Sequence, residues 1–370
     1  MFNTLDEDLN TKEYFKVKED FDYFAEILNI KLSFWLDSKC HTYKHSLRVL
    51  LFSLILAKKL KLNKDGVKIL GLSAIYHDTR RHDDLFDKGH GMRAAYYYKM
   101  SYKDYDLPYF EAVPLILSYH DQNDELAYKV IKDPNTSLLF KIFKDADALD
   151  RLRFGPSWLD TSYLRLKESF ELIPLATKLN SKIVDLEEKE VVNTSNGHYL
   201  IVVDMQNDFV TGSLGTKEAE SILKYVEIKA KSFNGEVIFT KDSHDDSYLD
   251  TIEGKNLPVK HCIRGTLGHD LVGDLELLVN QRQAKIIEKE TFGSLDLVNY
   301  LLKKEVKSLE LVGLCTDICV ISNAILLKTY FPNTPVFVDT NGVAGVSPKL
   351  NKEALDVLES LQVVVLNNFN

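Results

Sequence analysis

Apolar residues in the first half of the chain recur at intervals of three and four positions, the spacing of one face of a helix. The segments that follow this period are HSLRVLLFSLILAKKLKL, DGVKILGLSAIYHD and NTSLLFKIFKDADALDRL. Convincing strand patterns are absent up to about residue 190. The first half is therefore predicted to be an all-α bundle of amphipathic helices.

Short runs rich in β-branched residues begin after the polar, acidic stretch DLEEKEVVNTSNGH. The runs are YLIVVD, EVIFTKD, KIIEK, LELVGL, PVFVD and QVVVLN. Helix-like segments such as KEAESILKYVEIKAKSF separate them, and strands that alternate with helices indicate an α/β doubly wound, mostly parallel sheet. The pattern changes near residues 188–197, which predicts two domains, 1–190 and 197–370.

Composition and charge limit the classes of protein that remain. With 370 residues the chain is long enough to bury two cores, and its 45% hydrophobic and 27% charged residues are ordinary for a globular protein. The net charge of -9 argues against a preference for nucleic acid or anionic lipid. The longest apolar run, residues 49–57, is too short to cross a bilayer, and the N-terminus is too acidic and polar for a signal peptide. We expect a cytoplasmic protein with no nucleic-acid or membrane partner.

The four cysteines are scattered and do not resemble a disulfide framework. Two of them, Cys315 and Cys319, follow a predicted strand four residues apart, and no second Cys/His pair has the spacing of a zinc site. Asp204, Asp242 and Lys289 close other predicted strands. Because ligands of parallel sheets bind beyond the carboxyl ends of the strands, a carboxylate, an amine and a thiol are expected along one edge.

These groups can act together as a cysteine hydrolase. A cysteine in the first turn of a helix, near a lysine, is expected to favour the thiolate. An aspartate can take the thiol proton and later return it to a leaving amine. The turn from Gly313 to Thr316 can direct backbone N–H groups at a developing oxyanion. The spacing alone leaves open which of the two cysteines attacks.

The segments IVVDMQNDF, EKETFGS and GLCTDICVISNA resemble the isochorismatase-like cysteine hydrolases, and within them the nicotinamidases. The resemblance runs from about residue 198 to residue 370. It implies that Asp204 is the general base, Lys289 its partner and Cys319 the nucleophile. It also implies an oxyanion hole formed by the backbone N–H groups of Cys315 and Cys319, with a cis peptide bond before Cys315.

The segment FTKDSHDDSYLDTIEGKNLPVKHCIRGT resembles the metal-binding loop of nicotinamidases. The ligands that this resemblance implies are Asp242, His244, Glu253 and His261. Such a set suits zinc, manganese or iron. In that family the metal coordinates the pyridine nitrogen of nicotinamide, and Phe209 matches the aromatic residue that packs on the ring. The alternative is a solvated loop with incidental histidines.

Imidazoles and carboxylates also recur on three predicted helices of the first half, at His45, at the adjacent His77 and Asp78, and at Asp147. Helical bundles commonly build metal sites from facing helices. A mixture of imidazole and carboxylate suits a divalent metal that activates water. His41 is a rival to His45 for this role.

The segments HSLRV, AIYHDTRR and KDADALDRL resemble the HD-domain phosphohydrolases over roughly residues 35–160. The metal ligands implied by this resemblance are His45, His77, Asp78 and Asp147, for manganese, magnesium, iron or another divalent ion. His90 and His120 resemble the extra histidines that bind a second metal or contact phosphate in such proteins. Arg80 and Arg81 are candidate phosphate binders, and Ala148 stands where an arginine is usual.

The leading hypothesis is a bifunctional hydrolase. Its C-terminal domain would convert nicotinamide to nicotinate and ammonia through a thioester, and its HD domain would hydrolyse a nucleotide or another phosphate compound. The alternative is a cysteine amidase for another small carboxamide, with the HD domain as a nucleotide-binding regulatory module. Cysteine hydrolases of this type often self-associate, so a homo-oligomer is one expected state.

Overall fold

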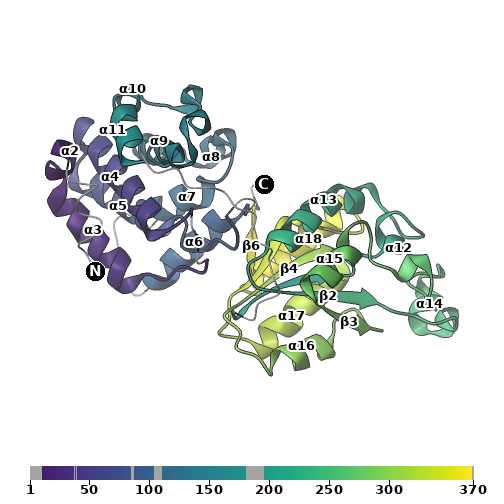
Figure 1. The fold of residues 1–370 in the computed structure, drawn as a ribbon. Coiled ribbons are helices and arrows are strands. Elements are labelled where there is room, and N and C mark those ends of the chain that lie inside the picture. Colours follow the sequence, from purple (N-terminus) through teal and green to yellow (C-terminus); the bar gives the residue numbers. More distant parts are fainter. Residues whose placement is uncertain are drawn as a thin grey trace. The chain divides into compact units, whose positions relative to one another are not determined.

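The computed structural model describes residues 11–36, 38, 40–84, 87–103, 111–180 and 196–368. It divides into two compact units, Met1–Glu188 and Lys189–Asn370 (Figure 1). Within the described part of the first unit every regular element is a helix. No described helix combines the length and apolar character that a bilayer crossing requires.

The first unit is built around one buried helix, α4 (Tyr43–Lys59). Thr42 caps it by accepting hydrogen bonds from the backbone N–H groups of Lys44 and His45. The other helices are α2 (Lys12–Phe15), α3 (Lys18–Lys31), α5 (Lys64–Tyr76), α6 (His90–Ser101), α7 (Ala112–Tyr119), α8 (Asp124–Val130), α9 (Pro134–Leu149), α10 (Lys167–Phe170) and α11 (Ile173–Leu179). The short 3-10 turns η1 (Asp150–Phe154), η2 (Pro156–Trp158) and η3 (Thr161–Tyr163) follow α9.

Close packing fixes the helices around α4. Helices α3, α5 and α9 pack against it, so its side chains from Leu47 to Ala57 are almost all buried. At Gly71 of α5 a Cβ atom would lie 2.3 Å from the ring of Phe24, so only glycine lets α3 and α5 approach this closely. The result places the start of α4, the end of α5 and the end of α9 next to one another.

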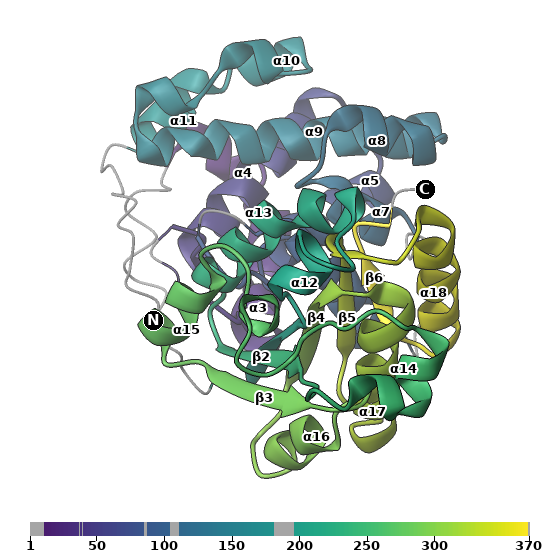
Figure 2. The ribbon, with the colours of Figure 1, turned by 90° about the vertical axis from the view of Figure 1, so that its right-hand side faces the viewer.

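The second unit is a six-stranded parallel sheet of order β3-β2-β1-β4-β5-β6, which confirms the predicted doubly wound architecture (Figure 2). The strands are β1 (His198–Val203), β2 (Glu236–Asp242), β3 (Lys285–Lys289), β4 (Ser308–Leu314), β5 (Val336–Ala344) and β6 (Val364–Leu366). Every strand pair is parallel. The order reverses between β1 and β4, and the carboxyl ends of strands at such a point form a crevice for ligands.

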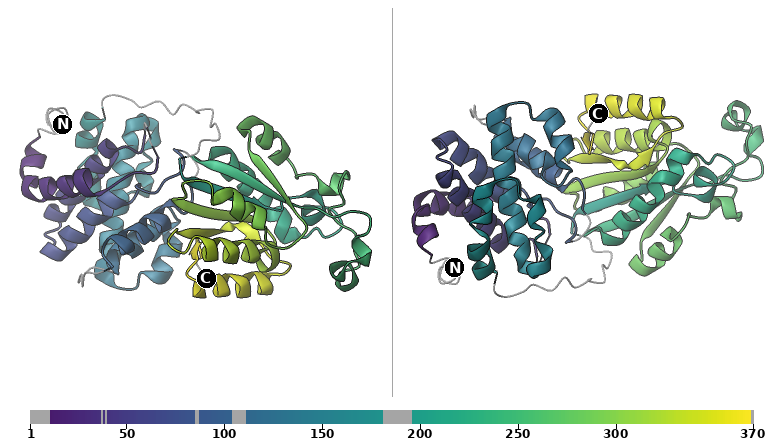
Figure 3. Two further views of the ribbon diagram at one scale, coloured as in Figure 1. Left: turned by 90° about the horizontal axis from the view of Figure 1, so that it is seen from below. Right: turned by 90° about the horizontal axis from the view of Figure 1, so that it is seen from above.

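Helices cover both faces of this sheet (Figure 3). One apolar cluster joins it to α16 (Leu295–Leu301), α17 (Ile321–Tyr330) and α18 (Pro348–Ser360). The cluster on the other face joins it to α13 (Lys217–Ser232) and α15 (Leu275–Arg282). Shorter elements lie at the carboxyl edge, namely α12 (Asn207–Val210), η4 (Tyr248–Asp250), α14 (Ile252–Asn256), η5 (Leu267–His269) and the π-helical turn η6 (Thr316–Val320).

Candidate functional sites

A carboxylate, an ammonium group and a thiol meet at the carboxyl edge of the sheet. Lys289, at the end of β3, places Nζ 2.6 Å from Asp204 Oδ2 and 3.5 Å from Cys319 Sγ. Asp204 directly follows β1, and its Oδ1 accepts a hydrogen bond of 2.6 Å from the Thr240 hydroxyl. All three groups are buried. The structure therefore brings together the triad that the sequence predicts.

Burial sets the protonation of this triad. It raises the pKa of the Cys319 thiol well above its ordinary value, and the Asp204 carboxylate adds to the shift while Lys289 opposes it. Lys289 thus favours the thiolate, as the sequence predicts, but desolvation of the thiol outweighs its effect. Burial also raises the pKa of Asp204, against the opposing charge of Lys289. A carboxylate with a raised pKa is a stronger base, which suits Asp204 to take the thiol proton.

The turn after β4 contains the cis peptide bond that the resemblance implies. The peptide bond between Leu314 and Cys315 is cis. Gly313 has φ 114, and a Cβ atom there would lie 2.0 Å from Val203 O, so glycine is required where β4 passes β1. The two cysteines differ in their surroundings, because Cys319 belongs to one apolar cluster and Cys315 packs against the cluster on the other face. Burial raises the pKa of the Cys315 thiol to about 12.

A second group of side chains, beside the triad, has the chemistry of a metal cage. Asp242 Oδ2 lies 2.9 Å from His244 Nε2 and 3.5 Å from His261 Nε2. Glu253 Oε1 lies 4.0 Å and 3.9 Å from the same two nitrogens. The Nδ1–H of His261 can donate to Val259 O at 2.8 Å, which leaves its Nε2 lone pair facing the cage. His244 Nε2 is buried and has no well-aligned hydrogen bond among the described residues. Asp242, His244 and His261 lie close enough together to hold one divalent cation, and Glu253 stands at the edge of this group.

Aromatic rings border this cage. The ring of Phe209 lies 5.5 Å from that of His261, and the ring of Tyr248 lies 4.6 Å from His244 and 4.8 Å from His261. Asp242 also connects the cage with the triad, because its Oδ1 is 3.5 Å from Lys289 Nζ. A planar ligand bound at the cage would therefore lie beside the thiol.

Sequence reasoning missed Gln206, which aligns the two sites. Its side-chain amide donates to Asp242 O at 2.8 Å and to His269 O at 2.9 Å, and its carbonyl accepts from Asp242 N at 2.7 Å. Gln206 stands two residues after Asp204 in the DMQNDF segment, so that segment carried a signal for a structural amide as well as for the base. It fixes the end of β1 to the end of β2.

In the first unit four histidines present the same ring nitrogen to a shared centre. Each directs Nδ1 at an oxygen atom, so Nδ1 carries the proton and Nε2 keeps a lone pair for a metal. The acceptors are Asp150 Oδ2 for His45, Ala74 O for His77, Asp87 O for His90 and Leu117 O for His120. The four Nε2 atoms form two pairs, His45 with His77 and His90 with His120, each 3.0 Å apart.

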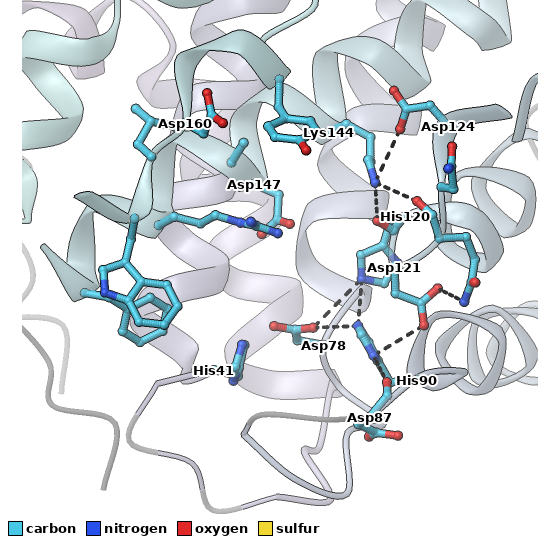
Figure 4. A pocket seen from close by; sticks show the side chains of 18 of the residues that line it. His41, Asp78, Asp87, His90, His120, Asp121, Asp124, Lys144, Asp147 and Asp160 are labelled. Carbon is cyan, nitrogen blue, oxygen red and sulfur yellow. Dashed lines mark hydrogen bonds and ion pairs between the residues drawn. The ribbon is translucent and has the colours of Figure 1, made fainter. Parts of the chain in front are cut away.

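Asp78 lies between the two pairs, and Figure 4 shows it beside His90 and His120. Its Oδ2 is 3.2 Å from His45 Nε2 and 3.4 Å from His77 Nε2. Its Oδ1 is 3.3 Å from His90 Nε2 and 3.9 Å from His120 Nε2. These contacts define two donor sets that share Asp78. The first consists of His45, His77 and Asp78, the second of Asp78, His90 and His120, and each fits a divalent cation.

Asp147 completes the first of these sets, with Oδ1 3.4 Å from His45 Nε2 and 3.9 Å from His77 Nε2. His41, the rival to His45, lies outside both sets. Its Nδ1 is 3.0 Å from Asp84 Oδ1, and burial lowers its pKa to about 3. The structure thus groups His45, and not His41, with the predicted ligands.

Both donor sets open onto a cavity of about 880 Å³. Arg81 lines it, with Nη1 3.5 Å from Asp78 Oδ1. Arg80 does not line it. Its Nη1 donates to Ser33 O at 2.6 Å, and its guanidinium lies 3.3 Å from the centre of the Tyr97 ring. Of the two arginines proposed for phosphate, only Arg81 is placed to meet a ligand in this cavity.

Asp150 supports the first donor set through a hydrogen bond to His45. It is fully buried, accepts from His45 Nδ1 at 2.7 Å, and pairs with Arg48 Nε at 2.5 Å. Arg153 Nη1 lies 3.4 Å from the same carboxylate. Asp150 thereby fixes the ring of His45 and its tautomer.

Substitution Asp150→Asn is expected to weaken manganese binding to the first unit by about 10- to 100-fold, because the orientation of His45 is lost. It should also destabilise the fold by about 3 kcal/mol, because the buried guanidinium of Arg153 and the partly buried one of Arg48 lose their counter-charge. Calorimetric titration of the purified chain with manganese measures the first effect, and denaturant unfolding measures the second.

Asp145→Asn is the matched control. Asp145 is equally buried, but it accepts hydrogen bonds from Arg165 N, Leu166 N and the Ser169 hydroxyl and lies outside the donor sets. It should destabilise the fold and leave manganese affinity unchanged. Equal losses of affinity in both variants would contradict the positioning role of Asp150.

The isochorismatase domain family matches residues 198–368. The chain is 32% identical over 176 residues to Nicotinamidase 1 of Arabidopsis thaliana. The matched region covers 41% of this chain and 70% of that protein. It is 34% identical to an uncharacterised isochorismatase family protein of Bacillus subtilis, over 34% of this chain and 75% of that protein. It is 30% identical to the nicotinamidase/pyrazinamidase of Mycobacterium tuberculosis, over 44% of this chain and 95% of that protein.

Proposed function

Because this chain belongs to the isochorismatase family through residues 198–368, we propose that its C-terminal unit is a cysteine-dependent amidase that converts nicotinamide and water to nicotinate and ammonia. The observation that carries the proposal is the placement of Lys289 Nζ between Asp204, at 2.6 Å, and Cys319, at 3.5 Å. The nicotinamidases among the relatives support nicotinamide as the substrate. Phe209 and Tyr248, beside the cage, suit a planar ring.

In this reaction Asp204 takes the proton of the Cys319 thiol, and the sulfur attacks the carboxamide carbon. Backbone N–H groups of Cys315 and Cys319 hold the oxyanion that forms. Asp204 then returns the proton to the amine, the C–N bond breaks, and ammonia leaves a thioester on Cys319. Water, deprotonated by Asp204, hydrolyses the thioester to nicotinate and restores the thiol.

Lys289 stays positively charged throughout. Its burial lowers the pKa of the amine, but the negative charge nearby, that of Asp204 foremost, outweighs burial and leaves that pKa raised. The ammonium group therefore stabilises the negative charge that moves between the carboxylate and the sulfur.

A zinc, manganese or iron ion held by Asp242, His244, Glu253 and His261 would supply a Lewis acid for the pyridine nitrogen of the substrate. The residues of the chain then orient the ring. Phe209 lies against His261, and Tyr248 lies against His244 and His261, so both rings border the place where the substrate ring would bind.

His261→Ala is expected to lower zinc affinity of the C-terminal unit by about 100-fold or more and to reduce kcat/KM for nicotinamide by a comparable factor. Treatment of the unchanged chain with a chelator should have the same effect on activity, and added metal should restore it. His198→Ala is the control, because His198 is also buried but begins β1, at the end away from Asp204, and contacts Ser308. Full activity of metal-free protein would contradict the role of the cage.

We further propose that the first unit hydrolyses the phosphate ester of a nucleotide or another phosphate compound. Support comes from the two donor sets that share Asp78, from the cavity onto which they open, and from the resemblance to HD-domain phosphohydrolases. Divalent ions such as manganese, magnesium or iron would there activate water and offset phosphate charge. Arg81, on the cavity wall, is the residue of the chain best placed to contact the phosphate.

Release of phosphate by the full chain with manganese and a panel of nucleotides tests this second activity. Turnover that depends on Asp78 supports a bifunctional hydrolase. A nucleotide that binds in the same cavity without phosphate release would favour the alternative, a regulatory module attached to the amidase.

A further inference from the structure

The cavity of the first unit has a second wall that differs chemically from the donor sets. It is formed after α9 by Phe154, Trp158 and Tyr163. The side chain of Trp158 is 49% exposed and that of Tyr163 is 69% exposed. Ligand cavities commonly combine a few polar groups that fix orientation with aromatic surface that takes the rest of the ligand. This wall has that second character.

The aromatic wall is fixed relative to the metal ligands. The rings of Phe154 and Trp158 lie 5.3 Å apart, and the Arg153 guanidinium lies 4.1 Å from the centre of the Phe154 ring. Arg153 in turn pairs with Asp150, which holds His45. A preorganised surface of this kind loses little conformational entropy when a flat ligand packs on it.

Arg151 is a cation of this cavity that remains available to a ligand. It follows Asp147 by four residues, about one helical turn, and is exposed. Among the described residues it has no hydrogen bond or ion pair, whereas Arg153 pairs with Asp150 and Arg165 pairs with Asp124. A free guanidinium beside a donor set suits phosphate, because its planar fork can donate two hydrogen bonds to phosphate oxygens.

The remaining charges favour a ligand with a single phosphate group. Asp124 and Asp160 lie on the side of the cavity away from Asp78 (Figure 4). The cations near Asp124 are committed to it, with Arg165 Nε at 2.5 Å and Lys144 Nζ at 3.6 Å. A second or third phosphate would therefore meet carboxylates there and few available cations.

We propose that this cavity binds a phosphate monoester whose alcohol part carries a planar aromatic ring, the class that includes nucleoside monophosphates, with Arg151 on the phosphate and Trp158 against the ring. The inference rests on the proposed phosphohydrolase function and narrows its substrate class. HD-domain proteins usually have an arginine at the position of Ala148. In the proposed complex Arg151 supplies that positive charge instead.

Binding of analogues that cannot be hydrolysed tests the proposal in the full chain loaded with manganese. The probes are phosphonates of adenosine monophosphate, uridine monophosphate and ribose 5-phosphate, with CH2 in place of the ester oxygen, and the methylene-bridged analogue of ADP. Calorimetry is expected to show that the two nucleoside phosphonates bind about tenfold more tightly than the ribose phosphonate, because of ring stacking. They should also bind more tightly than the ADP analogue.

Two variants assign the contacts. Trp158→Ala should abolish the preference for a nucleoside over ribose and leave binding of the ribose phosphonate unchanged. Arg151→Gln should weaken binding of all three monophosphonates by about the same factor, near tenfold. Trp35→Phe alters an indole outside the cavity lining and should change neither the preference for nucleosides nor the affinity for the phosphonates. Equal affinities for ribose and nucleoside phosphonates, tighter binding of the ADP analogue, or an unchanged preference in Trp158→Ala would overturn the proposal.

Binding of the phosphonates and release of phosphate, measured on the same chain, test the ligand class and the phosphohydrolase function separately. If the nucleoside phosphonates bind with the expected preference but no nucleoside monophosphate releases phosphate, the phosphohydrolase is refuted and the ligand class stands. If sugar and nucleoside monophosphates release phosphate with equal efficiency, the phosphohydrolase stands and the ligand class is wrong.

Discussion

Replacement of Cys319 by alanine is expected to lower ammonia release from nicotinamide by about 10⁴-fold or more, because it removes the nucleophile and the other catalytic residues cannot act without it. Its sulfur is the thiol that Lys289 contacts at 3.5 Å. The fold should tolerate the change, since alanine is smaller and apolar and Cys319 is buried in an apolar cluster. A coupled assay of ammonia with the purified chain measures the loss.

Cys315→Ala is the matched control. Its thiol packs against the apolar cluster on the other face of the sheet, and in the proposed reaction Cys315 contributes only its backbone N–H. It should retain activity to within about tenfold of the unchanged chain. If the two variants lose activity equally, or if Cys319→Ala still releases ammonia, the assignment of the nucleophile is wrong.

Asp78→Ala should have the largest effect in the first unit, because Asp78 is shared by two donor sets. Its two oxygens lie 3.2 Å from His45 Nε2 and 3.3 Å from His90 Nε2. Without Asp78 the bound ions would no longer stabilise the charge of the transition state. The loss of several kcal/mol of this stabilisation corresponds to a decrease in phosphate release of about 10³-fold or more. Metal analysis should show that the first unit loses both ions, and ammonia release by the C-terminal unit should not change.

Asp147→Ala provides the comparison, because of the two histidine pairs described above Asp147 lies within 4 Å of His45 and His77. It should weaken one metal site and spare the site at His90 and His120. If Asp78→Ala and Asp147→Ala lose the same number of ions, Asp78 does not act as a shared ligand.

The thiol site could be predicted from the sequence because its geometry follows from the sheet. Asp204 and Lys289 each stand at the end of a strand, and Cys315 follows one, so parallel pairing brings them to the same edge whatever the details of packing. The protonation of Cys319 could not be predicted in this way. It depends on how completely the folded chain removes the sulfur from water, and burial raises the pKa of the thiol against the opposing charge of Lys289.

In the first unit, sequence patterns could indicate which residues form the donor sets but not how these are supported. His45 and Asp150 are 105 positions apart in the chain, so no local spacing reveals their hydrogen bond. The neighbours Arg80 and Arg81 diverge because α5 ends at Tyr76 and the chain turns after it. Beyond the end of a helix its periodicity no longer specifies where a side chain points.

The proposed amidase reaction requires that Cys319 form a covalent thioester with the substrate. Acid quenching of the full chain during turnover of nicotinamide, followed by mass spectrometry of the intact protein and its peptides, tests it directly. A nicotinoyl adduct is expected on the peptide that contains Cys319, and it should be present in Cys315→Ala and absent in Cys319→Ala. An adduct that maps to Cys315, or one that persists in Cys319→Ala, would contradict it.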